Sequence, residues 1–369
     1  MKKSLSNLAV FGLLALTFAS CKKEYGIIPE EQTKVPGQIS SINGLYVLNE
    51  GNWGSNKASL DYYDYASGTY RKNIFNEANP GVTLGLGDVG NDIQIYGSRL
   101  YIVVNSSNKV EVLDVKTAKR IGKVDIPNSK YITFYKDNAY VTSYEGYVSV
   151  IDTATITEKA RIKVGREPEE MAVVGDKLYV ANSGGYTPSN YEKTVSVIDL
   201  KTNLEIKKID VAVNLNRLKA DKYGDLYVTS RGDYGKIQSN LFLIDTKKDE
   251  VVKAFDIRIS NLTIHNDMAY YFGITYDENW NSIASYGKIN IKDETKLEGN
   301  FITDGTDKKI KSPYGIAVDP LNEDIYITDA KDYVSPGALY RFNKSGVKVF
   351  EVSTGDLPAH LVFYTNPKK

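Results

Sequence analysis

The chain has 369 residues, of which 42% are hydrophobic and 25% charged, a composition typical of a soluble domain with a sizeable core. Its 46 basic and 46 acidic side chains cancel, and no basic stripe is visible, so the composition argues against a nucleic-acid partner. The single cysteine excludes a disulfide within the chain.

The N-terminal residues 1–20 have the pattern of a bacterial export signal. Two lysines precede an apolar run of 11 residues, Leu8–Phe18, which is too short to span a bilayer. The small residues directly before Cys21 resemble a lipobox, which predicts cleavage at this point and lipidation of Cys21. The alternative is an ordinary signal peptide that happens to contain a cysteine. On the preferred interpretation residues 21–43 form a lipidated tether, and residues 44–369 form the folded domain.

A unit of two apolar runs recurs seven times along this domain. In the first run a tyrosine follows Leu, Ile or Ala, and the second run ends in Asp or Asn, whose side chain can close a tight turn. The fourth copy, Gly175–Thr202, shows both runs clearly, and the second of them ends at Asp199. The tyrosines are 39 to 56 residues apart, which matches the period of propeller blades. They are Tyr46, Tyr101, Tyr140, Tyr179, Tyr227, Tyr270 and Tyr326.

Each copy predicts four antiparallel strands, A to D. In the fourth copy Glu170–Val174, rich in Ala and Val, is expected to be the innermost strand A, and Glu205–Val211 is expected to be strand D. The first copy starts at strand B with Leu45, whereas the chain ends in an A-like run, Ala359–Tyr364. The predicted fold is therefore all-β, a seven-bladed β-propeller with four antiparallel strands per blade. Its C-terminal strand closes blade 1 and removes an open sheet edge.

The connections predict a binding face. In a propeller the B–C and D–A connections lie on one face, and the B–C loops here are long and aromatic, whereas A–B turns such as Gly175–Lys177 are short. The longest D–A connection, Asn76–Asp92, is expected to lie across the same face. A single loop tyrosine is usually solvated, but the concentration of aromatic and arginine side chains favours binding. The predicted ligand-binding residues are Asn52, Trp53, Asp88, Asn91, Tyr144, Arg166, Tyr186, Tyr191, Arg217, Arg231, Tyr234, Tyr276, Trp280, Tyr314 and Tyr333.

Signals of catalysis are weak, and we expect no enzyme activity, catalytic residue, cofactor or metal. There is no Gly-x-Ser-x-Gly motif, and the glycine-rich run 81–90 lacks the Lys-Ser/Thr of a phosphate-binding loop. The cluster of Asp88, Asn91 and Asp92 lacks the full spacing of a calcium loop. His265 is expected to be structural, whereas His360, at the start of the closing strand, could face the channel mouth.

The repeat Leu-Tyr-Val-x-Asn with Val-Ile-Asp-x-x-Thr resembles the YncE-like seven-bladed propellers from Leu45 to Tyr364. The segments Gly44–Gly54 and Leu84–Asp88, together with the lipobox, are similar to the BtuG family of Bacteroides surface lipoproteins. This resemblance implies a lipoprotein of the outer membrane, exposed at the cell surface and anchored through Cys21. It would bind cobalamin as a transported ligand and deliver it to a TonB-dependent transporter. Two alternatives remain open: a protein-interaction or structural propeller of the cell envelope, and a hydrolase or lyase with an axial metal.

Overall fold

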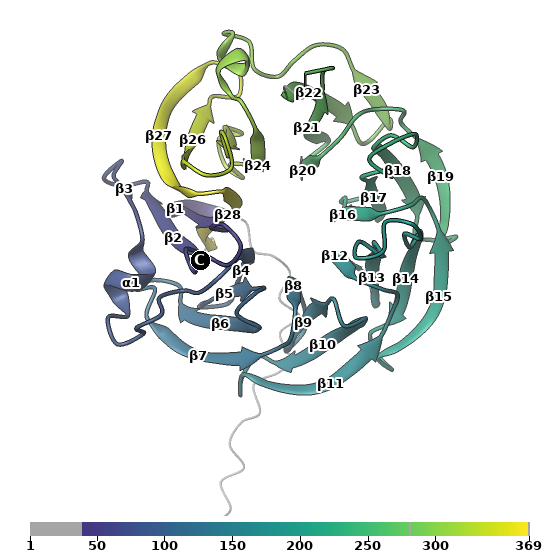
Figure 1. The fold of residues 1–369 in the computed structure, drawn as a ribbon, viewed down its shortest axis with the longest axis horizontal. Helices are drawn as coiled ribbons and strands as arrows, with labels where there is room; N and C mark the ends of the chain where they lie inside the picture. Colours follow the sequence, from purple (N-terminus) through teal and green to yellow (C-terminus); the bar gives the residue numbers. More distant parts are fainter. Residues whose placement is uncertain (1–38, 280–281, 368–369) are drawn as a thin grey trace, which may run out of the picture. The chain divides into compact units, whose positions relative to one another are not determined.

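The computed structural model describes residues 39–279 and 282–367. In this part of the chain seven four-stranded antiparallel sheets surround a central axis, as the predicted seven-bladed propeller requires (Figure 1). The predicted export signal, Cys21 and Trp280 lie outside the described residues. Within those residues no helix is both long and apolar enough to cross a membrane.

The blades follow the chain order, and each runs from an inner strand to an outer strand. Blade 1 contains β28 (Pro358–Pro367), β1 (Ile39–Asn49), β2 (Ser59–Asp64) and β3 (Tyr70–Arg71), and blade 2 contains β4 (Gly90–Tyr96), β5 (Arg99–Val104), β6 (Lys109–Asp114) and β7 (Arg120–Asp125). Blade 3 contains β8 (Ser129–Tyr135), β9 (Asn138–Ser143), β10 (Tyr147–Asp152) and β11 (Thr157–Lys163), and blade 4 contains β12 (Pro168–Val174), β13 (Lys177–Asn182), β14 (Thr194–Asp199) and β15 (Leu204–Asp210). Blade 5 contains β16 (Leu215–Ala220), β17 (Asp225–Ser230), β18 (Asn240–Asp245) and β19 (Glu250–Ala254), blade 6 contains β20 (Asn261–His265), β21 (Met268–Tyr276), β22 (Ser282–Asn290) and β23 (Thr295–Leu297), and blade 7 contains β24 (Pro313–Val318), β25 (Ile325–Asp329), β26 (Pro336–Phe342) and β27 (Lys348–Asp356). Two short helices, α1 (Ile74–Ala78) and η1 (Thr306–Lys309), lie in D–A connections.

The ring is closed by the end of the chain, which confirms the prediction from its first and last repeats. β28 is the inner strand of blade 1 and pairs antiparallel with β1, with Leu45 opposite Phe363 and Leu48 opposite His360. β1 begins at Ile39, before the expected domain start at residue 44, because its partner β28 continues as far as Pro367. The start of β1 and the end of β28 therefore lie side by side on one face of the ring.

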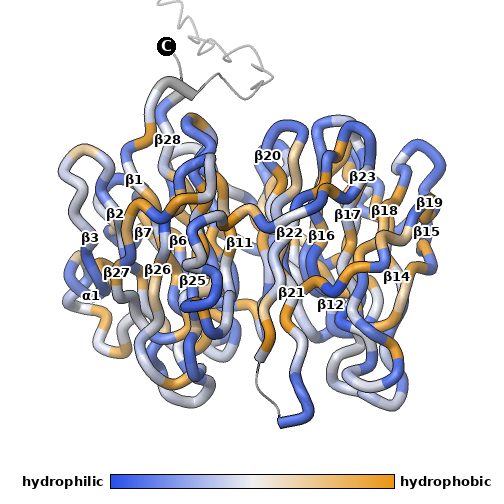
Figure 2. Tube along the Cα trace, turned by 90° about the horizontal axis from the view of Figure 1, so that it is seen from above, coloured by the Kyte–Doolittle hydropathy of each residue, from blue (hydrophilic) through white to orange (hydrophobic). Residues whose placement is uncertain are grey.

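The hydrophobic core lies between neighbouring blades. Seven clusters of buried side chains each join one blade to the next, and the seventh joins blade 7 to blade 1 through Tyr326, Leu339, Leu45 and Val47. The hydrophobic stretches accordingly follow the strands, whereas the connections at the two ends are largely hydrophilic (Figure 2). Each blade has two apolar faces to bury, so the closed ring is what removes them from water.

The repeated tyrosines and acids have the structural roles expected of them. Five of the tyrosine hydroxyls hydrogen-bond to the turn after strand C of the next blade, which ties adjacent blades together. These contacts are Tyr46 to Val115, Tyr140 to Asn203, Tyr179 to Asp249, Tyr227 to Ile291 and Tyr326 to Tyr65. At the end of strand C, Asp199 accepts the backbone N–H groups of Lys201 and Thr202, and Asp114, Asp152 and Asp245 act in the same way. The motif is scaffold throughout.

Candidate functional site

The B–C and D–A connections meet on one face, as predicted. In six blades the first residue after strand B donates its backbone N–H to a carbonyl at the end of a D–A connection. The donor and acceptor pairs are Glu50 and Leu357, Asn105 and Val89, Tyr144 and Asn128, Ser183 and Glu167, Arg231 and Asn214, and Ala330 and Ser312. Five of the acceptors have a left-handed backbone with φ between 43° and 60°, namely Val89, Asn128, Glu167, Asn214 and Leu357. This sharp turn starts each of those inner strands at the axis.

A β-bulge follows the turn and sets the side chains that face the axis. In β12, Pro168 pairs with Asn182 and Met171 with Val180, so two residues of the inner strand, Glu169 and Glu170, lie opposite the single residue Ala181. The same one-residue excess occurs in β4, β8, β16, β24 and β28, whereas β20 pairs without a shift. A bulge bends the strand and re-aims its side chains. In blades 3, 5 and 7 a buried threonine of strand B accepts the N–H that the bulge leaves unpaired, as Thr142 does for Tyr131 at 3.0 Å.

A pocket of about 670 Å³ lies on this face. Side chains from six blades line it, among them Lys130 and Tyr131 of blade 3 and Phe272 of blade 6. Seven of the fifteen residues predicted from the loops also line it: Asn91, Arg217, Arg231, Tyr234, Tyr276, Tyr314 and Tyr333. The volume falls within the ~300–1,000 Å³ of small-molecule sites, and the lining combines aromatic with charged groups.

The structure places the other predicted residues around or beneath the pocket. Trp53 and Tyr186 are exposed on the rim, with 84% and 67% of their surfaces accessible. Tyr144 lies deeper, because its hydroxyl donates to Glu169 and its ring meets the edge of Tyr186. Tyr191, in the same B–C loop as Tyr186, is half-buried. These side chains extend the aromatic character of the face outward from the pocket.

Three predicted polar residues are occupied by structural contacts. Asp88 accepts the backbone N–H groups of Gly54 and Asn56, which holds the first B–C loop. Arg166 pairs with Glu192 at 3.3 Å and donates to the carbonyl of Asn190, and Asn52 donates to the carbonyl of Tyr333. They shape the loops around the pocket.

The connection 76–92 departs from the expected path, since Asn79 bonds the C–D turn of blade 2 at Ala118 and Arg120.

Charged side chains fill the axis below the pocket, which the expectation of an Ala- and Val-rich inner strand did not anticipate. Glu169 is fully buried and its Oε1 accepts from Nη1 of Arg231 at 2.9 Å. Burial by itself raises the pKa of the Glu169 carboxyl, but the charges of Arg231 and Lys130 and the hydroxyl of Tyr144 hold that pKa below its ordinary value. Its neighbour Glu170 likewise pairs with Lys219 at 2.6 Å.

A second axial group surrounds His360, which lies at the axis as its position in the closing strand suggested. Its Nε2 is 3.6 Å from Oε1 of Glu50, and its Nδ1 is 3.9 Å from Oδ1 of Asp92. Burial favours protonation of Glu50, but His360 and the hydroxyl of Tyr314, 2.7 Å away, lower the pKa of the Glu50 carboxyl. Burial raises the pKa of Asp92, which accepts the N–H of Ile132 in the next blade.

The sequence contains a signal for this axial set. Consecutive polar residues stand at the start of several inner strands, at the positions where the bulges occur: Asn91 and Asp92, Lys130 and Tyr131, Glu169 and Glu170, and Asn216 and Arg217. Strict alternation would send one member of each pair away from the axis.

The three residues considered as a calcium cluster, Asp88, Asn91 and Asp92, make separate contacts in the structure. Asp88 holds a loop, Asn91 donates to the carbonyl of Lys130, and Asp92 accepts backbone N–H groups. The described residues contain no group of three or more His, Cys, Asp or Glu side chains that could hold an ion.

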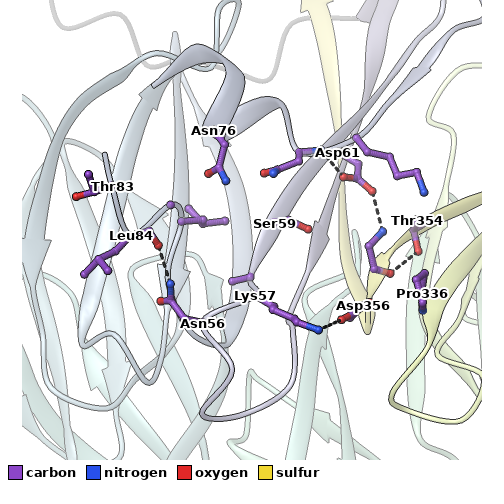
Figure 3. Close-up of a pocket in the computed structure, with 16 residues that line it drawn as sticks. Asn56, Lys57, Ser59, Asp61, Asn76, Thr83, Leu84, Pro336, Thr354 and Asp356 are labelled. Carbon is purple, nitrogen blue, oxygen red and sulfur yellow. Dashed lines mark hydrogen bonds and ion pairs between the residues drawn. The ribbon is translucent and has the colours of Figure 1, made fainter. Parts of the chain in front are cut away.

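A second cavity of about 540 Å³ lies where blades 1 and 7 meet (Figure 3). Its lining includes Lys57, Asn76 and Leu84 and the buried carboxylate of Asp61. Both carboxylate oxygens of Asp61 accept hydrogen bonds, from the backbone N–H groups of Asn73 and Gly355 and from the hydroxyl of Tyr70. The lining mixes polar with apolar groups such as Leu84, and the buried carboxylate of Asp61 serves the scaffold.

The fold and the pocket define the chain as a seven-bladed propeller with a preformed concavity on its B–C face. The chain belongs to the family described as a domain of unknown function, DUF5074, whose model matches residues 43–365. No curated protein matches it.

Solved structures share the fold at low sequence identity. A quinonprotein alcohol dehydrogenase-like protein of Bacteroides thetaiotaomicron is 16% identical, with a TM-score of 0.60 over 87% of this chain and 78% of that one. The hydrazine synthase of Kuenenia stuttgartiensis is 20% identical, with a TM-score of 0.57 over 73% and 88%. The WD40 domain of Neurospora crassa Pan2 is 12% identical, with a TM-score of 0.56 over 73% and 81%. At these identities the likeness concerns the fold alone.

Proposed function

We propose that this propeller is a non-catalytic binding protein that captures cobalamin on its B–C face and passes it to a TonB-dependent outer-membrane transporter. The observation that carries the proposal is the pocket of about 670 Å³, which tyrosines and charged side chains line together. The resemblance of Gly44–Gly54 and Leu84–Asp88 to cobalamin-binding surface lipoproteins names the ligand.

The pocket and its rim suit a large ligand with a flat ring and a polar edge. Cobalamin exceeds a drug-sized ligand, so only part of it would enter the pocket and the remainder would lie against the exposed Trp53, Tyr186 and Tyr234. Tyrosine and tryptophan offer large contact areas at a small entropic cost. Because the bulged inner strands already hold the axial side chains, little ordering would oppose binding.

The position of the first strand fits an anchored protein. β1 starts opposite the end of β28, and the two strands run from there to His360 and Leu48 beside the pocket. A tether from Cys21 would therefore join the propeller on the face away from the pocket.

Calorimetric titration with cyanocobalamin tests the proposal. The chain without its first 20 residues should give a saturable heat and a higher thermal midpoint in the presence of the vitamin. No heat and no shift at micromolar ligand would remove cobalamin as the ligand.

A second candidate, a protein-interaction propeller of the cell envelope, is favoured by exposed apolar side chains on the same face. Trp53, Leu84 and Val334 are 84%, 74% and 71% accessible. Exposed apolar groups gathered on one face mark protein contacts. This function predicts co-purification of an envelope protein from cells and no affinity for small molecules, and it loses its support if Trp53→Ser leaves that co-purification unchanged.

A further inference from the structure

The pocket carries an excess of positive charge. Its charged lining residues are Glu50, Lys130, Arg217, Arg231 and Arg258, that is, four cations and one acid. The acid is already engaged, because Glu50 accepts from Tyr314 and lies 3.6 Å from His360. The charges of the pocket therefore do not balance one another.

Pairing with the acids beneath the pocket removes only part of this excess. Glu169 pairs with Arg231 at 2.9 Å, and Glu170 pairs with Lys219 at 2.6 Å. Among the described residues, neither Arg217 nor Lys130 has a carboxylate within salt-bridge distance. Within the described residues Lys130 and Arg217 thus face the pocket without a carboxylate in direct contact, as does the exposed Arg258, and Glu169 acts on Lys130 and Arg217 only at longer range.

The Arg217 guanidinium is held in place but does not use all of its hydrogen-bond donors. Its Nη1 donates to the hydroxyl of Tyr131 at 2.8 Å, and the guanidinium lies 5.4 Å from the centre of the Tyr131 ring. Its Nε is buried and has no hydrogen-bond partner. The backbone N–H of Arg217 is bound to Thr229, so the bulge that positions the side chain is itself secured.

Lys130 approaches from another blade. Its Nζ lies 4.8 Å from the centre of the Tyr144 ring and makes no hydrogen bond or ion pair within the described chain. Burial lowers the pKa of the Lys130 amine, although the nearby carboxylates of Glu169 and Glu50 act in the opposite direction. Arg217 belongs to β16 in blade 5 and Lys130 to β8 in blade 3, so the two cations reach the pocket from different directions.

We propose that Arg217 and Lys130 form an oxyanion subsite at the base of the pocket, which takes a phosphate or phosphodiester group. A tetrahedral anion presents oxygens to both cations at once, and arginine and lysine are the usual phosphate-binding side chains. The inference rests on the proposed function only for the identity of the whole ligand. The phosphate could belong to the nucleotide loop of cobalamin or to a different phosphorylated molecule.

The first test uses inorganic phosphate as the probe. Phosphate should raise the thermal midpoint of the purified chain in a saturable manner, and Arg217→Gln and Lys130→Met should each weaken its binding by about tenfold or more. Arg217→Lys, which keeps the charge, should lose less. Lys163→Met, which removes one charge from the exposed outer strand β11, should bind like the original chain. Absence of saturable binding, or equal binding by all the variants, overturns the subsite; circular dichroism shows which variants are folded.

The second test separates the subsite from the proposed function. Cyanocobalamin should bind more tightly than dicyanocobinamide, which lacks the phosphodiester, and Arg217→Gln should abolish most of that difference. Equal binding of both corrinoids keeps cobalamin capture and refutes the subsite. Phosphate binding that depends on Arg217, without binding of either corrinoid, keeps the subsite and refutes cobalamin capture.

Discussion

Replacement of Arg231 by methionine tests whether Arg231 compensates the buried negative charge of Glu169. The Glu169 side chain is 1% accessible and its Oε1 takes the Arg231 donor at 2.9 Å. Without Arg231 the carboxylate stays buried beside Lys130 and Tyr144, which compensate only in part. We expect Arg231→Met to lower the free energy of unfolding by ~3 kcal/mol, the low end of the cost of stranding a buried charge.

The assay is urea unfolding followed by circular dichroism, with Glu169→Gln/Arg231→Met as the matched control. The double variant should recover most of the loss, because it buries no unpaired charge. A cost under ~1 kcal/mol for Arg231→Met, which is the scale of an exposed ion pair, would show that Arg231 does not compensate a buried charge.

The pH dependence of the free energy of unfolding tests the Glu169–Arg231 pair independently. The folded-state pKa of Glu169 is lowered, so the pair stabilises fully above the unfolded value of ~4.3 and loses this contribution as the pH falls through the folded-state pKa. In Arg231→Met the burial of Glu169 raises that pKa instead. The deficit of the variant should therefore be largest near neutral pH and shrink toward pH ~4. A deficit that is constant with pH contradicts this account.

Three further outcomes follow from single contacts. Tyr179→Phe removes the hydroxyl that meets Asp249 at 2.6 Å, and should cost ~1–2 kcal/mol in urea unfolding; a cost near zero would show that the repeated tyrosine acts by packing alone. Gly315→Ala places a Cβ against the carbonyl oxygen of Ala359, so its thermal midpoint should fall by several degrees, and an unchanged midpoint would mean that β24 and β28 can separate at no cost. Tyr234→Ala, at the pocket, should weaken cyanocobalamin binding by ~2 kcal/mol in calorimetry, while Tyr223→Ala, in the A–B turn of the same blade, should not; equal effects would place the ligand elsewhere.

The fold was predictable because its signals are local and repeated. Equivalents of Tyr179, and of Asp199 as Asp or Asn, recur in every blade; Tyr179 bonds to the next repeat and Asp199 acts within its own. The closure by β28 followed from a missing first strand and an extra last one. Periodicity of this kind survives the variation of the loops between the repeats.

The site was only partly predictable because its geometry depends on single-residue irregularities. The long B–C loops led to Tyr234 and Tyr333, which do line the pocket. The bulges that turn Glu169 and Arg217 toward the axis change the register by one residue, which a hydrophobic pattern does not show. Asp88 is equally ambiguous in sequence, since a carboxylate that holds a loop and one that binds a ligand look alike.

A crystal structure of the chain with cyanocobalamin would show whether, and where, the propeller binds the vitamin. We expect the vitamin on the B–C face, against Tyr234 and Tyr314, with its phosphodiester beside Arg217 and Lys130. An empty pocket at saturating vitamin, or a vitamin bound on the face where β1 begins, contradicts this expectation.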